Sequence, residues 1–445
     1  MTQHAPNGDA DSNTDALRTS RLPGYFRLSV AERLDLLRQQ GRIDDDDVAL
    51  LSDPSRGLPV DVANAMIENV IGVYGLPIGL GLNFLVNGKE YIVPLVVEEP
   101  SIIAAVSHTA RLVRDAGGFS VDADEPLMIG QVQIIGCPDP DLAREALLDH
   151  RQRILDTANT FHPRMVERGG GALDIEVRTL TDDLAHQSRY NTMVVLHILV
   201  HTCDAMGANI INTMAEGVAP LVEELTGGRV YLRILSNLAD RRLVRASCRI
   251  PFQHLAWKGY HGADVAEGIA AASRFAELDP YRATTHNKGV MNGIDAVALA
   301  TGNDWRAIEA GAHAYCARDG RYRPMATWHT EDEHLVGRIV VPLAVGTVGG
   351  PIRLHPTLKV LYKILDVSSA QELACVMGAV GLAQNLAALK ALATEGIQSG
   401  HMALHARSVA ATARLSHDAL DPLIQPSAAD PRPDRNRPPA HTLEG

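Results

Sequence analysis

The chain has 445 residues, with 53 Asp and Glu against 41 Lys and Arg, so it exceeds one ordinary domain and is mildly acidic. This charge balance gives no indication of a nucleic-acid surface, which needs a clustered basic face. The five cysteines stand far apart without a CxxC pair, which argues against a disulfide framework or a zinc ribbon and favours a reducing, cytoplasmic compartment.

The chain is expected to begin with an unstructured segment, because residues 1–22 are polar and rich in Asn, Asp, Thr and Ser. Ser29 to Gln40 is predicted to be an amphipathic helix capped by Ser29, with Glu32 three residues later. The apolar residues that define its buried face are Val30, Leu34 and Leu37.

Tyr91 to Val97 is apolar and rich in valine, which predicts a buried strand, while Pro94 indicates an edge position or a bulge. The strand leads directly into Glu98 and Glu99, and alternation places one of the two toward solvent and the other inward. A helix is expected from Pro100 onward. A carboxylate at this strand end is therefore well placed to face a cleft.

From about residue 126 the pattern becomes strand, helix, strand, strand, helix, strand, which is typical of a small ferredoxin-like α+β unit. The strands are predicted at Leu127 to Ile135, Leu173 to Leu180, Met193 to Thr202 and Val230 to Leu235. The helices are predicted at Asp141 to Asn159 and Asn209 to Thr226. The apolar side of the first helix is expected to consist of Leu142, Ala146, Leu147 and Ile154.

The segment Asp204 to Asn209 follows a predicted strand and opens a predicted helix. Backbone N–H groups at a helix start are suited to bind a pyrophosphate, although an ordinary helix cap by Asp204 explains the spacing equally well. The chain has no GxGxxG fingerprint of a Rossmann fold, and Gly169-Gly170-Gly171 is more typical of a tight turn.

The stretch from Asp279 to Gly293 is the most informative one, because Arg, His, Asn and Lys surround two glycines there. From about 263 to 318 the pattern predicts helices, with a long one from Ala263 to Leu278. Within this region, the lysine segment with its glycines is expected to form a loop that cradles an anionic substrate. Lys288, between Asn287 and Gly289, would by itself be taken as a surface lysine on a glycine loop.

Near the C-terminus the predicted elements are a strand at Leu335 to Val345, a glycine loop at residues 346–350 and a helix at Ser369 to Thr394. Gln384, Asn385 and Lys390 make the apolar part of this helix a core element rather than a membrane span. From Pro426 the chain is expected to be unstructured.

No metal site is predicted. His401 and His405 stand four residues apart, which is a metal-ligand spacing on a helix, but no HExxH arrangement accompanies them. The cluster from His329 to His334 is expected to be a solvated turn. Asp304, soon after the lysine segment, is by spacing alone a candidate helix N-cap.

Four segments resemble, in the same order, the motifs of 3-hydroxy-3-methylglutaryl-coenzyme A (HMG-CoA) reductases: Val97-Glu98-Glu99-Pro100-Ser101, Asp204-Ala205-Met206-Gly207-Ala208-Asn209, Asp279 to Gly293, and Gly400-His401-Met402. The resemblance covers roughly residues 20 to 410. The membrane anchor of eukaryotic members is not seen in the chain, which looks like the soluble class II bacterial form.

The resemblance implies an α+β fold, in which a large helix-rich domain carries an inserted ferredoxin-like small domain and a short C-terminal flap. The implied division is 1–22 as a disordered N-terminus, 23–125 and 237–394 as the large HMG-CoA domain, 126–236 as the small NAD(P)-binding domain, 395–425 as the flap with its catalytic histidine, and 426–445 as a disordered tail.

The resemblance also assigns four catalytic residues. Glu99 would donate a proton at the aldehyde stage, which needs a pKa raised by partial burial. Lys288 would polarise the thioester carbonyl, with Asp304 hydrogen-bonded to it. His401 would protonate the departing CoA thiolate. The implied reaction interconverts HMG-CoA and two reduced nicotinamides with mevalonate and CoA, by two hydride transfers at one carbon.

The implied cofactor is NADH or NADPH. Its implied contacts are Asp204, Met206, Gly207, Asn209 and His162. NADH-preferring class II members carry an acid where this chain has His162, so NADPH is expected to be accepted. The implied contacts of the hydroxymethylglutaryl group are Ser101, Asn237, Arg282 and Asn292, and Arg282 would clamp its free carboxylate.

The resemblance implies a homodimer with shared active sites that associates further. One alternative is a reductase of another branched acyl-CoA, which a change at Arg282, Asn237 or Asn292 would favour. A second is a catalytically silent CoA- or nucleotide-binding paralogue of the same fold. Loss of a catalytic residue would indicate that paralogue, and all four catalytic residues are present.

Overall fold

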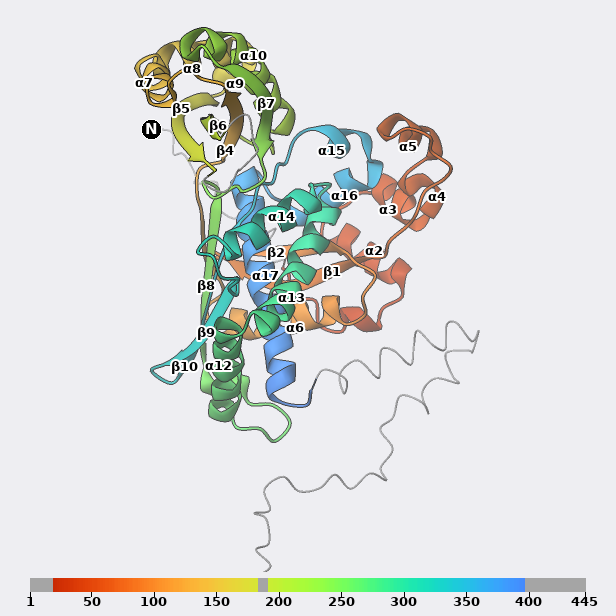
Figure 1. The fold of residues 1–445 in the computed structure, drawn as a ribbon. Helices are drawn as coiled ribbons and strands as arrows, with labels where there is room; N and C mark the ends of the chain where they lie inside the picture. Colours follow the sequence, from red (N-terminus) through yellow and green to blue (C-terminus); the bar gives the residue numbers. More distant parts are fainter. Residues whose placement is uncertain (1–18, 183–190, 397–445) are drawn as a thin grey trace, which may run out of the picture. The chain divides into compact units, whose positions relative to one another are not determined.

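The computed structural model describes residues 19–182 and 191–396, and Figure 1 shows its ribbon. The predictions for His401 and for residues 397–445 lie outside the described residues. The described chain combines helices with three sheets whose strand pairs are antiparallel. This mixed content confirms the predicted α+β class.

Two sheets belong to the large part of the chain. One pairs β1 (Ile78–Val86) with β2 (Lys89–Val96). The other has four strands in the order β3 (Ser120–Ala123), β8 (Leu243–Pro251), β10 (His334–Pro342) and β9 (Ala326–Glu331). The strand predicted from Tyr91 to Val97 is confirmed as β2. In the described chain, β2 pairs with β1 alone. Pro94 is tolerated there because an edge strand needs no donor on its open side.

The largest hydrophobic core surrounds helix α17, which packs against α13, α6, α12 and β8 and appears in blue in Figure 1. The helices of this part are η1 (Tyr25–Arg27, a 3-10 turn), α2 (Val30–Gln39), α3 (Asp45–Ser52), α4 (Pro54–Gly57), α5 (Val60–Met66), α6 (Ile102–Asp115), α11 (Phe252–Leu255), α12 (Gly262–Leu278), α13 (Pro280–Ala300), α14 (Trp305–Cys316), α15 (Gly350–Leu354), α16 (Pro356–Leu365) and α17 (Ala370–Ala393).

Helix α17 is the described helix that is long and apolar enough to cross a membrane, but 78% of its most apolar window is buried inside the protein. Its polar residues Gln384, Asn385 and Lys390 are also buried. Asn385 Oδ1 accepts a hydrogen bond of 2.8 Å from Trp328 Nε1. The helix is therefore a core element, as predicted.

The small unit is a four-stranded sheet in the order β5-β6-β4-β7, with helices packed against it. Its elements are β4 (Leu127–Ile135), α7 (Pro140–Asp149), α8 (Arg151–Thr160), α9 (Pro163–Val166), β5 (Gly171–Thr181), β6 (Thr192–His201), α10 (Ala208–Thr226) and β7 (Arg229–Ser236). Strand β4 lies between β6 and β7, which is the ferredoxin-like order, and the unit has a hydrophobic core of its own. The predicted topology is correct.

Two helix predictions need correction. The single helix predicted from Asp141 to Asn159 is broken at His150, whose φ of −98° and ψ of 20° leave the helical region. Leu142, predicted on the apolar side, is exposed, because the buried face of α7 is formed by Ala143 and Leu147. Val30 is also exposed at the first position of α2, although its Ser29–Glu32 capping box forms as predicted.

The segment from Asp279 to Gly293 forms most of α13, which agrees with the helices predicted over residues 263–318. The loop expected at the lysine is wrong. Asp279 caps the helix by accepting hydrogen bonds from the N–H groups of residues 281 and 282, and Pro280 occupies the first helical position. Gly293 allows a close approach of helices, since a Cβ there would lie 3.1 Å from the carbonyl oxygen of Val380 in α17. Gly293 therefore serves helix packing rather than a turn, whereas a Cβ at Gly289 would make only an ordinary contact of 3.9 Å with Ala388.

The first described residues, 19–22, fall within the segment that was predicted to be unstructured. Ser20 is fully buried, and its backbone N–H donates to Glu90 Oε2 at 2.5 Å. The Glu90 carboxylate also accepts hydrogen bonds from the hydroxyls of Thr19 and Ser20 and pairs with Arg114 of α6. Residues 19–22 are thus tied to β2, whereas a disordered segment was expected through residue 22.

Candidate active site

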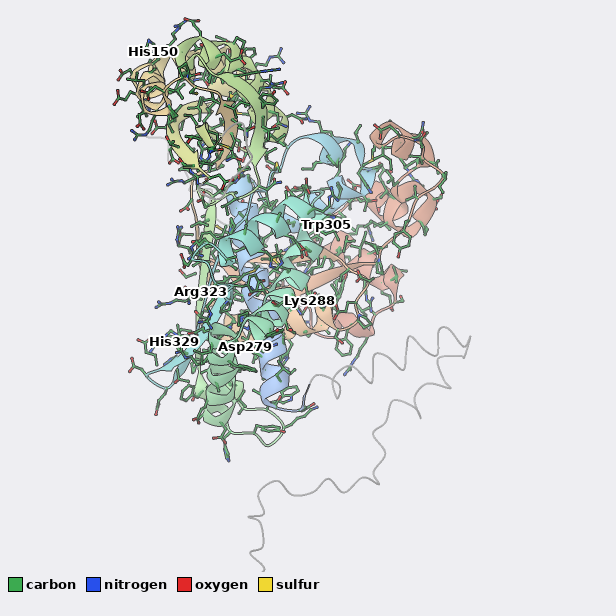
Figure 2. All side chains as sticks on the ribbon, in the orientation of Figure 1. His150, Asp279, Lys288, Trp305, Arg323 and His329 are labelled. Atoms are coloured by element: carbon green, nitrogen blue, oxygen red, sulfur yellow. The ribbon has the colours of Figure 1, made fainter. Side chains whose placement is uncertain are left out.

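Lys288 and Glu99 form an ion pair on the surface of the large part. The Nζ atom of Lys288 lies 2.8 Å from Glu99 Oε2, with 61% and 37% of the two side chains exposed. Figure 2 shows Lys288 on α13, between the labelled Asp279 at the start of the helix and Trp305 beyond its end. The pair is anchored but remains open to a ligand.

The residues before Lys288 hold it in place. His286 and Asn287 are buried, and His286 Nε2 lies 2.9 Å from the carbonyl oxygen of Ala326. The Asn287 side chain donates to the Arg323 carbonyl at 2.9 Å and accepts from the Met325 N–H at 2.8 Å. Burial lowers the pKa of His286 to about 4, so this histidine is neutral at pH 7. Because its neighbours are fixed, Lys288 projects outward from a rigid turn of helix.

Glu99 contacts Lys288 from the loop between β2 and α6. It follows β2, and the alternation expected there is observed, since Glu98 is exposed and Glu99 is half-buried. Ser101, at the start of α6, has a φ of 78° in the left-handed region. A non-glycine residue in this region costs about 1–3 kcal/mol and is found preferentially at functional sites. This strain marks the loop that carries both predicted site residues.

The other predicted substrate contacts divide into two groups. Asn292 stands one helical turn after Lys288 and therefore on the same face of α13. Arg282 is half-buried in the first turn, about 9 Å before Lys288 along the axis, and burial lowers its pKa. Asn237, in contrast, packs against α14, because a Cβ at Gly311 would lie 2.5 Å from its carbonyl oxygen.

Asp304 is not beside Lys288 in the single chain. It caps α14 by accepting from the Ala307 N–H at 3.1 Å, and it lies 3.6 Å from Arg306. Within the described chain it has no ion pair with Lys288, and Ala300, the last residue of α13, is already about 18 Å beyond the lysine along the helix axis. The predicted hydrogen bond is therefore not formed within one copy.

Asp304 instead lines a cavity of about 520 Å³ together with the second motif. The cavity is lined by residues 205–210, 302–304, 306, 346 and 348–352. Met206, Gly207 and Asn209, which were predicted to contact the cofactor, all line this cavity. Gly207 is the N-cap of α10 with a φ of 104°, a conformation that favours glycine. The backbone N–H groups of residues 207–210 have no acceptor in the described part of the protein.

Asp204 is not among the residues that line this cavity. It also does not cap α10, whose N-cap is Gly207. Asp204 Oδ1 accepts from the Ala370 N–H at the start of α17, at 2.9 Å, and its carbonyl oxygen accepts from the Thr347 N–H, at 2.9 Å. It therefore ties the second motif to α17 and to the glycine loop. Three residues that were not predicted donate hydrogen bonds to backbone carbonyls of the cavity lining. Arg242 donates to Ala205, and Asn303 and Tyr362 donate to Gly346.

His162 lies away from the cavity, at the start of the short helix α9. Its Nε2 atom is buried and has no hydrogen-bond partner within the described chain. The neighbouring Arg164 is exposed. A ligand that reached His162 would have to contact its other ring nitrogen.

His401 and His405 lie outside the described residues, so the structure does not test their spacing. Among the described residues, no three His, Cys, Asp or Glu side chains are gathered as metal ligands. Asp332 and Glu333 form the turn between β9 and β10, both with positive φ. The predicted solvated turn at residues 329–334 is correct, although the structure shows it as part of a β-hairpin.

The chain is similar to known proteins over most of its length. The chain matches the family model described as hydroxymethylglutaryl-coenzyme A reductase over residues 29–406. It is 47% identical over 408 residues to the 3-hydroxy-3-methylglutaryl-coenzyme A reductase of Archaeoglobus fulgidus, covering 92% of this chain and 90% of that one. It is 38% identical over 344 residues to a probable reductase of the same name from Borreliella burgdorferi, covering 77% of each chain. A solved structure of the class II reductase from Streptococcus pneumoniae, bound to NADPH in open conformations, is similar with a TM-score of 0.80 and 45% identity, covering 84% of this chain and 99% of that chain.

Proposed function

Because the chain belongs to the hydroxymethylglutaryl-coenzyme A reductase family, we propose that its reaction interconverts HMG-CoA and two reduced nicotinamides with mevalonate and CoA. The chain is an NAD(P)H-dependent oxidoreductase, and the family expected from its motifs is confirmed. The roles of its individual residues are our proposal.

The ion pair of Lys288 and Glu99 is the observation that carries the proposal. Lys288 donates to the thioester oxygen and stabilises the negative charge that develops there, an effect worth several kcal/mol when the donor is preorganised. Glu99 orients the ammonium and supplies a proton at the aldehyde stage. Since the Oε2 and Nζ atoms are 2.8 Å apart, one oxygen of a bound substrate can meet both groups.

The hydroxymethylglutaryl group is proposed to lie along α13 and the loop before α6. Asn292 is one turn from Lys288 and can bind the substrate beside the reacting carbonyl. Ser101 is held by its left-handed backbone next to Glu99. Arg282 clamps the free carboxylate, for which a guanidinium offers two parallel donors.

The cavity lined by residues 205–210 and 346–352 fits part of a dinucleotide, because the N–H groups of residues 207–210 are free to face an anion. A nicotinamide cofactor bound there would supply the hydride. We propose that the chain accepts NADPH as well as NADH. The solved relative from Streptococcus pneumoniae is bound to NADPH. This chain also has a histidine at position 162, where an acid would repel a 2′-phosphate.

A site shared between two copies explains why Asp304 and Asn237 lie apart from Lys288. We propose a homodimer in which these two residues of one copy meet the Lys288–Glu99 pair of the other. An exposed apolar segment before β1 supports such a contact. Its most exposed large side chains are Ile67 (65%), Ile71 (104%) and Tyr74 (87%).

The remaining assignments extend this proposal. Residues 126–236 would bind the cofactor, and residues 23–125 with 237–394 would bind HMG-CoA. Residues 395–425 would form the flap in which His401 protonates the CoA thiolate. We place the enzyme in the cytoplasm, since the five cysteines are unpaired thiols.

Absorbance at the nicotinamide band tests the function. The purified chain is mixed with HMG-CoA and either NADH or NADPH, and separately with mevalonate, CoA and either oxidised cofactor. Reduced nicotinamide should be consumed in the first reaction and formed in the second. A folded chain that turns over neither pair with either cofactor would favour the silent paralogue.

A further inference from the structure

Arg242 is a buried arginine directly behind the cavity that holds the second motif. Only 4% of the residue is exposed. Its guanidinium contacts oxygens rather than solvent: Thr202 Oγ1 at 3.3 Å, the Ala205 carbonyl at 3.4 Å, the Met206 carbonyl at 3.5 Å and the Val345 carbonyl. Arg242 therefore holds two segments that lead into the cavity lining: residues 202–206, of which 205 and 206 line the cavity, and residue 345, which precedes the lining residue Gly346.

The same two segments are joined at other points. The Thr347 N–H donates to the Asp204 carbonyl at 2.9 Å, and a Cβ at Gly346 would lie 2.6 Å from the Met206 nitrogen. Asn303 accepts from the Gly346 N–H at 2.7 Å and donates to its carbonyl at 3.1 Å. The two segments are thus in contact beside the cavity. Arg242 donates hydrogen bonds to both of them.

The contacts of Arg242 also orient the motif. The Met206 carbonyl turns toward the guanidinium, and a trans peptide plane points its C=O and N–H in opposite directions. The N–H of that plane belongs to Gly207, which lines the cavity. Arg242 thereby turns the first free N–H of the motif toward the cavity.

A buried charge needs a reason, because a neutral side chain of similar volume would avoid its desolvation cost. Burial lowers the pKa of Arg242 to about 10, and Asp204 acts in the opposite direction, so the guanidinium is charged at neutral pH. A buried positive charge attracts an anion more strongly than an exposed one does, because water screens it less.

We infer that Arg242 is a positioning residue for the diphosphate of the dinucleotide cofactor, which it serves by fixing the two segments that lead into the cavity lining, by aiming the Gly207 N–H and by placing a positive charge beneath the anion. This inference rests on the proposed function, because it takes the cavity to be the cofactor site. It assigns no direct contact between Arg242 and the cofactor.

The test compares Arg242→Met with Arg42→Met in the full chain. Arg42 is a matched control, since it is also buried and donates to a backbone carbonyl, that of Ile364 at 3.1 Å, but it does not line or support the cavity. Melting temperature reports the stability of each variant. Calorimetry gives Kd for NADPH, NADH, ADP-ribose and adenosine, and kinetics gives KM for HMG-CoA.

Arg242→Met should raise Kd for NADPH, NADH and ADP-ribose by about tenfold, which corresponds to ~1.4 kcal/mol, while Kd for adenosine and KM for HMG-CoA stay within about threefold. Arg42→Met should lower the melting temperature without changing these constants. Arg242→Lys keeps the charge and should recover part of the loss. If Arg242→Met does not fold, Arg242→Lys becomes the test variant. An Arg242→Lys variant with the wild-type Kd for ADP-ribose would then overturn the inference.

Unchanged Kd values for the diphosphate ligands in a folded Arg242→Met variant would also overturn it. Equal losses for adenosine and ADP-ribose would do the same, because they would indicate general distortion of the cavity. A wild-type chain that binds none of these ligands would instead contradict the proposed function.

Discussion

Lys288 is the residue on which the proposed chemistry depends. Its neighbours are buried and bonded, whereas its own side chain reaches out of α13 to Glu99. Replacement by alanine should remove the group that stabilises the developing oxyanion, with little effect on the fold. We expect Lys288→Ala to lower kcat by about a thousandfold or more, at an unchanged melting temperature.

The exposed Lys359 of α16 is a suitable control for this measurement, because it has no ion pair in the described chain. Lys359→Ala should retain wild-type turnover. Near-normal activity of a folded Lys288→Ala variant would remove Lys288 from the mechanism, and the ion pair with Glu99 would then be a surface contact of little energetic value.

His401 lies outside the described residues, so its role remains a prediction that kinetics can test. If it protonates the CoA thiolate, His401→Gln should strongly reduce turnover of HMG-CoA, from which a thiolate must depart. Reduction of free mevaldehyde expels no thiolate and should be affected much less. Both rates are read at the nicotinamide band, and equal losses for the two substrates would argue against the assigned step.

At the scale of elements, local signals predicted what local chemistry determines. The Ser29–Glu32 capping box starts α2, and the alternation from Leu127 to Ile135 predicts β4, a central strand of the small sheet. The helical pattern predicted over residues 263–318 is confirmed by α13, but a loop was expected at Lys288 because the segment contains two glycines, which in isolation indicate a turn. Gly293 is explained by its close packing against α17, a contact between residues distant in the sequence.

The site shows the same limit. Each motif is visible in the sequence, but the position of Asp304 relative to Lys288 depends on the length of α13, where a loop was expected around Lys288. Arg242 could not be distinguished from the adjacent Arg241, since only the fold buries one and leaves the other paired with Glu176 on the surface.

Glu90 ties Thr19 and Ser20 to β2, and this contact should depend on pH. Burial raises its pKa, but the hydrogen bonds from Arg114 and Ser20 outweigh burial and lower the pKa to about 2. A carboxyl whose folded-state pKa is depressed stabilises the fold above its unfolded pKa near 4.5, and the effect is lost as pH falls toward 2.

Glu90→Gln should therefore lower the free energy of unfolding by about 1–2 kcal/mol at pH 7, with a smaller difference from wild type at pH 3. Urea unfolding at both pH values measures it. Glu267→Gln, at an exposed position of α12, is the control and should have no effect at either pH. A loss for Glu90→Gln that is equal at pH 7 and pH 3 would show that its charge is not responsible.

At the scale of the whole molecule, the exposed segment before β1 is expected to hold two copies together. Ile71 is fully exposed in the single chain, so Ile71→Asp should not affect the fold of the monomer. At an interface, the buried and unpaired charge should weaken dimerisation by about 3 kcal/mol or more. Sedimentation should then show monomers, and turnover should fall although Lys288 is unchanged.

Leu142→Asp provides the matching control, since Leu142 is also an exposed apolar residue but lies on α7 of the small unit. It should leave the dimer and turnover intact. An Ile71→Asp variant that remains dimeric and active would show that this segment is not the contact.

The central claim is that Lys288 and Glu99 of one copy work with Asp304 of another. It is tested most directly by mixing two inactive variants, Lys288→Ala and Asp304→Asn, under conditions where subunits exchange, as native mass spectrometry can verify. In a mixed dimer one of the two sites then contains both intact residues. Because about half of the dimers are mixed, the mixture should regain about a quarter of wild-type turnover. A mixture of exchanged subunits that stays inactive would contradict the shared site and place Asp304 with the Lys288 of its own chain.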